Sequence, residues 1–286
     1  MAVVLAYMPL IKRAPQKIGI AYTSKDVLIS VPAIAPDKPM AATWFQPAVW
    51  QGATVLVICG AGEDRLSFKW KMFKYLLGKN VAILTIDPPG HGDYMTVPST
   101  VDNARKAAQA AADWLFGQPH VRKVGAIGIS FGGCQVAALA AADTRIAAMC
   151  SIASPVVLQP VTRPVIVREA IRLLLPLNIA LLRHVSIRDV LAEWKSLRGA
   201  WYGESLYDMI QQFKIDECVR QIGTRPTLIV HGAQDMAVPP HNAHQIHDAA
   251  HPERELLMVS QATHLTVVLR DRPMKRVAEW MAEKLA

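Results

Sequence analysis

The chain has 286 residues, of which 52% are hydrophobic and 19% charged, and its formal net charge is +8 at pH 7. This apolar content is too high for a disordered protein, and it is enough for one large core with or without an inserted segment. The excess of Lys and Arg would suit an anionic partner. However, no basic run interleaved with aromatic residues is present, so we expect no nucleic-acid binding.

Cysteine usage and hydropathy bear on the cell compartment. The four cysteines have no CxxC spacing and no metal-ligand pattern, and three of them lie in apolar or glycine-rich stretches, where cysteine is usually a small buried apolar residue. This usage predicts a reduced, cytoplasmic setting. The apolar first residues lack the basic region and the small-residue cleavage site of a signal peptide. The longest apolar stretch in the middle, residues 173–182, contains Pro176 and Asn178 and is too short to span a membrane. We therefore expect no membrane span.

Short β-rich runs alternate with segments of helical period along most of the chain. The expected strands are residues 26–31, 54–59, 81–86, 123–129, 227–230 and 255–259. The expected helices are residues 65–77, 101–116, 131–142, 241–250 and 273–285. Because strands such as 54–59 are apolar throughout, they predict an α/β fold with a mainly parallel, doubly wound sheet that is buried on both faces. Ser99 and Asp102 predict a capping box at the start of helix 101–116, and Gly117 its C-terminal end.

This alternation is interrupted between about residues 155 and 224. The stretch has helical patterns over 165–175, 187–197 and 204–214, several prolines and no convincing strand. Such a block predicts a helical cap inserted above the carboxyl edge of the sheet, where open α/β folds bind ligands. We therefore expect a core of residues 1–154 and 223–286 and a cap, or lid, of residues 155–222.

The sharpest local motif is G-x-S-x-G, formed by residues 128–132 between an apolar strand and a helical segment. A turn from strand to helix in one step forces Ser130 into a strained backbone conformation, and Gly128 and Gly132 leave room for the neighbouring chain. The motif predicts that the Ser130 hydroxyl is a nucleophile at the edge of the sheet. A glycine-rich turn with a spectator serine is the alternative.

A serine nucleophile needs a base that takes its proton and an acid that orients the base. Asp235 lies in the loop after strand 227–230, and His264 lies in the loop after strand 255–259. Because carboxyl ends of parallel strands meet at one edge, the sequence predicts a Ser130–His264–Asp235 catalytic triad.

Other residues could take these roles. His91 and His231 are alternative bases, but each more readily bonds its local backbone. Asp87 and Asp93 are alternative acids, but they are better explained as residues that hold the shape of the loop after strand 81–86.

A metal site is the alternative interpretation of four histidines near the predicted helix 241–250. They fall on the face opposite its apolar residues, which is typical of a solvated helix surface. No Cys or carboxylate completes a four-ligand set, so we expect no metal; the residues are His241, His244, His247 and His251.

These motifs together resemble the α/β-hydrolase superfamily. GISFGG (residues 128–133) resembles its nucleophile elbow, HGAQDMAVP (residues 231–239) its acid loop, and His264 its catalytic base. DPPGHG (residues 87–92) is similar to its D-x-x-G-x-G loop. The resemblance covers residues 50–155 and 222–285, leaves the cap unmatched and identifies no subfamily. It implies an α/β-hydrolase fold and acyl transfer to Ser130 followed by hydrolysis, with no metal or organic cofactor.

The resemblance also implies an oxyanion hole after strand 54–59. Cys59 stands where many members of the superfamily have a histidine, but the donors are backbone groups and survive that change. We expect the N–H groups of Phe131 and Ala61 to be the donors, with Gly62 as the alternative to Ala61.

The predicted function is hydrolysis of carboxylic esters, with small to medium hydrophobic substrates. A thioesterase or acyltransferase acting on a CoA- or carrier-bound acyl group is the alternative, and the net positive charge would suit a phosphate-bearing carrier. A non-enzymatic binding protein on the same fold is a further alternative. The expected partner is a small-molecule ester or thioester, and a homodimer is left open.

Overall fold

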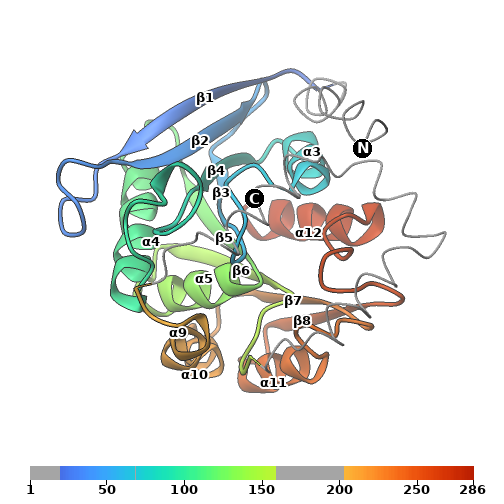
Figure 1. The fold of residues 1–286 in the computed structure, drawn as a ribbon. Helices are drawn as coiled ribbons and strands as arrows, with labels where there is room; N and C mark the ends of the chain where they lie inside the picture. Colours follow the sequence, from blue (N-terminus) through green and yellow to red (C-terminus); the bar gives the residue numbers. More distant parts are fainter. Residues whose placement is uncertain (1–19, 68, 159–202) are drawn as a thin grey trace, which may run out of the picture.

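An eight-stranded sheet runs through the centre of the protein (Figure 1). The computed structural model describes residues 20–67, 69–158 and 203–286. The strands, in chain order, are β1 (Tyr22–Ile29), β2 (Met40–Pro47), β3 (Ala53–Ile58), β4 (Ala82–Ile86), β5 (Lys123–Ile129), β6 (Ile146–Ile152), β7 (Thr227–Gly232) and β8 (Arg254–Val259). Their spatial order is β1-β2-β4-β3-β5-β6-β7-β8.

The sheet is parallel except at one edge. β2 pairs antiparallel with both β1 and β4, and all other neighbours are parallel. β3 lies between β4 and β5, so the chain adds β4 on one side of β3 and then continues on the other. Such a reversal creates a crevice at the carboxyl ends of the strands, where open α/β sheets bind ligands. The predicted, mainly parallel α/β fold is confirmed.

Helices cover both faces of the sheet (Figure 1). One face packs against α3 (Trp70–Gly78) and α12 (Asp271–Lys284). The other face packs against α4 (Val101–Phe116), α5 (Phe131–Ala142), α9 (Leu206–Phe213), α10 (Ile215–Gln221) and α11 (His241–Ala249). A short 3-10 turn, η2 (Gly92–Tyr94), follows β4.

Strand β3 shows why the central strands are apolar throughout. Val55 and Val57 belong to the core under α3 and α12, whereas Leu56 and Ile58 belong to the core under α4 and α5. Successive side chains of a strand point to opposite faces, so a strand that is covered on both sides carries apolar residues at most of its positions. All four cysteines are free and buried, whereas the sequence predicted burial for three of them.

The structure differs from the sequence-based prediction in several elements. Strands β2 and β6 were not expected, and the helix expected over 65–77 begins only at Trp70. The predicted capping box is wrong, because Thr100 is the N-cap of α4 and its side chain accepts from the Asn103 N–H. Gly117 does end α4, but in a right-handed conformation with φ −79° that does not require glycine.

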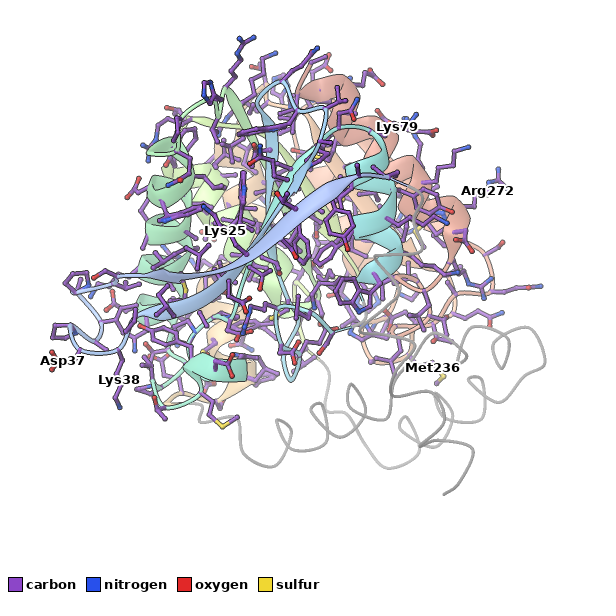
Figure 2. The ribbon with its side chains drawn as sticks, turned by 90° about the horizontal axis from the view of Figure 1, so that it is seen from above. Lys25, Asp37, Lys38, Lys79, Met236 and Arg272 are labelled. Carbon is purple, nitrogen blue, oxygen red and sulfur yellow. The ribbon has the colours of Figure 1, made fainter. Side chains whose placement is uncertain are left out.

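The connection between β1 and β2 packs against the core through Ile34 and Ala35, and its tip is exposed. Figure 2 shows Asp37 and Lys38 at its tip, on the opposite side of the molecule from Lys79, which follows α3, and Arg272 in α12. Met236, in the loop after β7, lies at the edge of the drawn side chains, apart from the other labelled residues (Figure 2).

Only the beginning and the end of the predicted cap are among the described residues. The helix expected over 204–214 is α9, and it is followed by α10, which was not expected. Both helices add apolar residues to the core of the face that carries α5. The helices expected over 165–175 and 187–197 lie outside the described residues, and the boundaries of the cap stay a prediction. In the part of the chain described here, no helix is long and apolar enough to cross a membrane.

Candidate active site

Ser130 lies at the sharp turn between β5 and α5, as the motif predicts. Its backbone has φ 50° and ψ −120°, which is a strained conformation for a residue with a Cβ atom. The Ser130 N–H donates to Ile152 O on β6 at 2.7 Å, and Ser130 O accepts from the Gly133 N–H at 2.9 Å. Hydrogen bonds on both sides of the residue therefore hold the strained turn.

Two glycines make this turn sterically feasible. A Cβ atom on Gly128 would lie 2.3 Å from Gly132 O, and a Cβ atom on Gly132 would lie 2.3 Å from Ile58 O. These contacts are with backbone atoms, which cannot move aside cheaply. The spacing G-x-S-x-G thus lets α5 begin directly against the end of β3.

Ser130, His264 and Asp235 form a continuous row of hydrogen-bonded side chains. His264 Nε2 lies 3.1 Å from Ser130 Oγ, and His264 Nδ1 lies 2.7 Å from Asp235 Oδ2. The Asp235 side chain is fully buried and that of His264 is 17% exposed. The three residues come from the loops after β5, β7 and β8, and the structure brings them together at the carboxyl edge of the sheet.

Asp235 is held by its own loop as well as by His264. Its Oδ1 accepts from the Val238 N–H at 2.8 Å, and His231 Nε2 lies 2.8 Å from Val238 O and 3.4 Å from Asp235 Oδ2. Burial alone would raise the pKa of Asp235, but the charges and hydrogen bonds of His264 and His231 outweigh it and hold the pKa at about 2. The carboxyl group is therefore an anion at neutral pH.

The loops that carry Asp235 and His264 are joined by backbone contacts. The N–H of Gln234 donates to Ala262 O at 2.9 Å, and a Cβ atom on Gly232 would lie 2.5 Å from the same oxygen. Gly232 therefore allows the His264 loop to pass closely over the end of β7. This close approach sets the distance between the histidine and the aspartate.

The other histidines occupy different positions. His231 supports the Asp235 loop, and His91 is buried with its Nδ1 2.9 Å from Pro89 O, where burial lowers its pKa. The histidines in and after α11 are exposed or half-buried on the face opposite Ala243 and Ile246, as the helical pattern predicts. Within the described ranges, no group of three or more His, Cys, Asp or Glu residues is placed to hold a metal ion.

Asp87 and Asp93 belong to an ion-pair network around Arg65 that sequence reasoning missed. Asp87 accepts from the backbone N–H groups of Arg65 at 2.7 Å and of Asp93 at 2.9 Å. The Arg65 guanidinium also pairs with both carboxylates. The network ties the loop after β3 to the loop after β4, so the two aspartates hold loop shape, as expected. Arg65 lies 22 residues from Asp87, and no local pattern could have indicated the pairing.

The residues expected to form the oxyanion hole lie in two segments that meet at Ser130, the start of α5 and the turn after β3. Phe131 is the first residue of α5, and Ala61 and Gly62 lie in the turn that follows β3. A Cβ atom on Gly60 would lie 3.2 Å from Ser130 Cβ, so this turn packs directly against the elbow. Cys59 is buried at the start of the turn, and its Sγ donates to Glu63 O at 3.5 Å. Sequence reasoning also missed Glu63 and Lys69, which form a buried ion pair beneath the turn.

The model of the alpha/beta hydrolase family matches residues 55–280, which is most of the chain. The chain belongs to the alpha/beta hydrolase family. The match includes the elbow, the acid loop and His264, and membership supports hydrolysis as the general class of activity. No curated protein has a significantly similar sequence.

Solved structures share the fold at low sequence identity. The esterase domain of a Rhodothermus marinus protein is 18% identical with a TM-score of 0.62, over 91% of this chain and 97% of that one. A bromoperoxidase from Bacillus anthracis is 17% identical with a TM-score of 0.65, over 91% and 100%. A membrane phospholipase A described as a bacterial virulence factor is 18% identical with a TM-score of 0.66, over 99% and 92%. At this identity the likeness shows the fold alone.

Proposed function

We propose that this alpha/beta hydrolase family member is a serine hydrolase that cleaves carboxylic esters through an acyl-enzyme. The observation that carries the proposal is the hydrogen-bonded row from Ser130 Oγ through His264 to the buried Asp235. A serine hydroxyl becomes a competent nucleophile only with such a base and such an orienting acid.

In the first half of the reaction, Ser130 Oγ attacks the ester carbonyl carbon while His264 Nε2 accepts the hydroxyl proton. Asp235 accepts a hydrogen bond from His264 Nδ1–H, which fixes the tautomer with a free Nε2 and stabilises the imidazolium that forms. The tetrahedral intermediate collapses, and His264 gives its proton to the departing alcohol. The acyl group is then bonded to Ser130 Oγ.

In the second half, a water molecule attacks the acyl carbonyl as His264 Nε2 accepts one of its protons. Collapse of the second tetrahedral intermediate returns that proton to Ser130 Oγ and releases the carboxylic acid. In both halves, negative charge develops on the carbonyl oxygen. The N–H groups of Phe131 and Ala61 are the proposed donors to it, with Gly62 as the alternative to Ala61.

The proposed substrates are esters whose acyl groups are apolar and of small to medium size. A panel of 4-nitrophenyl esters of increasing chain length tests the proposal, with Ser130→Ala as the paired variant. We expect turnover by the wild-type protein and none by Ser130→Ala, whose circular dichroism spectrum should be unchanged. Equal turnover by the two proteins, or none by the wild type across the panel, would contradict the proposal.

A further inference from the structure

The turn after β3 contains a buried pair of opposite charges. The Lys69 side chain is fully buried and that of Glu63 is 10% exposed, and Lys69 Nζ lies 3.1 Å from Glu63 Oε2. Lys69 Nζ also donates to Asp64 O at 2.8 Å and to Ser67 O at 2.5 Å, so all three ammonium protons have acceptors. Removing one partner of a buried pair leaves an uncompensated charge, which proteins tolerate poorly. The carboxylate of Glu63 is therefore fixed in place.

The fixed carboxylate in turn closes the peptide chain around Ala61 and Gly62. Glu63 Oε2 accepts from the Gly60 N–H at 3.2 Å, and the Glu63 N–H donates to Gly60 O at 3.2 Å. Ala61 and Gly62 lie between these two bonds, and Gly62 has φ 85°. Since both bonds join Gly60 to Glu63, the two ends of the turn, the directions of the N–H groups between them depend on where the Glu63 carboxylate is held.

The turn packs closely against the nucleophile at Gly60. A Cβ atom on Gly60 would lie 3.2 Å from Ser130 Cβ, 3.4 Å from Ile129 O and 3.6 Å from Glu63 Cδ. Gly60 is thus packed against both Ser130 and the Glu63 carboxylate. A movement of the carboxylate would be transmitted to the turn and to its position relative to Ser130 Oγ.

We infer that Glu63 and Lys69 are positioning residues that hold the turn after β3 in the geometry of an oxyanion hole. Lys69 fixes the carboxylate of Glu63, the carboxylate closes the turn, and the turn points the Ala61 N–H at the oxygen of the carbonyl group that Ser130 attacks. This inference rests on the proposed function. Neither side chain touches the substrate. Because the hole acts mainly on the charged transition state, its loosening should lower kcat and leave KM nearly unchanged.

The first readout is the rate at which a fluorophosphonate probe labels Ser130, because it requires no knowledge of the natural substrate. The phosphoryl oxygen gains negative charge during attack by Ser130 Oγ, with fluoride as the leaving group, and needs the same donors. Loss of one such donor costs about 10²- to 10³-fold in rate. We expect Lys69→Met to lower the labelling rate by about 10- to 100-fold, because it misplaces the donor rather than removing it.

Glu63→Gln is the second variant, and it guards against a failure of Lys69→Met to fold. The amide is similar in size to the carboxylate, and its oxygen can still accept from Lys69 Nζ and the Gly60 N–H, so we expect the protein to fold with a lowered Tm. Its labelling rate should be about 3- to 30-fold below that of the wild type. Glu255→Gln is the matched control, because it breaks the Arg276–Glu255 ion pair (2.5 Å) between β8 and α12. We expect it to label within about twofold of the wild-type rate.

The second readout separates positioning from general damage to the fold. With a 4-nitrophenyl ester as substrate, the Glu63 and Lys69 variants should lose kcat with KM within about twofold, whatever the change in Tm. Folded variants with wild-type labelling rates, or variants in which only KM rises, would overturn the inference while leaving the proposed function intact. Wild-type protein that the probe does not label at Ser130 would overturn both.

Discussion

The nucleophile side and the acid–base side of the site are built by different physical means. On the nucleophile side, the elbow is held by close backbone packing, at distances that exclude a Cβ atom on Gly128 or Gly132. On the acid–base side, Asp235 and His264 are held mainly by hydrogen bonds beside the edge strand β8, whose residues are all half-buried. The elbow is therefore sensitive mainly to added volume, and the Asp235–His264 pair mainly to changes of charge and protonation.

The largest expected effect is on the acid–base side. His264→Ala removes the group that accepts the Ser130 proton, and we expect ester turnover to fall by about 10⁴-fold or more. His244→Ala, an exposed histidine on α11, is the control and should turn over esters at the wild-type rate. Steady-state assays of the two variants check this. Normal turnover by His264→Ala would move the base elsewhere, and His91 would be the first residue to test.

The second-largest effect is expected from added volume at the elbow. Gly132→Ala places a Cβ atom against Ile58 O and Cys59 O, and we expect a loss of about 3 kcal/mol in the free energy of unfolding, together with loss of turnover. Gly117→Ala is the matched control, since its Cβ atom would lie at least 3.4 Å from its neighbours and its φ is −79°.

Urea unfolding of the two glycine variants measures this difference. The Gly117→Ala protein should be as stable as the wild type or slightly more stable. Equal stabilities of the two variants would show that close packing does not hold the elbow.

The smallest expected effect is on the pH dependence of the free energy of unfolding, through the carboxyl group of Asp235. His264 and His231 hold the pKa of Asp235 at about 2 despite its burial, so ionised Asp235 stabilises the folded state by about 2 kcal/mol above the unfolded pKa of about 4. Because the folded-state pKa is lowered, this stabilisation is lost as the pH falls from about 4 through about 2. In denaturant titrations, the free energy of unfolding of Asp235→Asn should therefore fall less steeply over this pH interval than that of the wild type.

Asp37→Asn, at the exposed tip of the β1–β2 connection, is the control and should keep the wild-type pH dependence. If the free energy of unfolding of Asp235→Asn fell with pH as steeply as that of the wild type, the histidines would not stabilise the carboxylate.

The parts of the fold that could be predicted are those encoded in short-range patterns. Apolar runs predict β3, β4 and β5, whereas β2 and β6 were missed because alanines and a methionine in each weaken the β signal. The helix expected from residue 65 begins at Trp70, because Arg65 and Lys69 are used in ion pairs of the preceding loop. Those pairs depend on tertiary contacts, which hydrophobic periodicity does not reveal.

The residues of the candidate site also divide into those that the sequence could predict and those that it could not. Ser130, Asp235 and His264 could be placed at one edge of the sheet because each follows a recognisable parallel strand. Glu63 and Lys69 could not be placed, because charged residues are almost always solvated and only the fold reveals that these two are buried. The sequence thus indicates which groups can react, and the packing reveals what holds them.

The most direct measurement is to find where an acyl group is attached during turnover. The protein is mixed with a 4-nitrophenyl ester, quenched in acid within the first turnovers, digested and mapped by peptide mass spectrometry. The account predicts an acyl adduct on Ser130, absent from Ser130→Ala and strongly reduced in His264→Ala. An adduct on another residue, or ester turnover by Ser130→Ala at the wild-type rate, would contradict it.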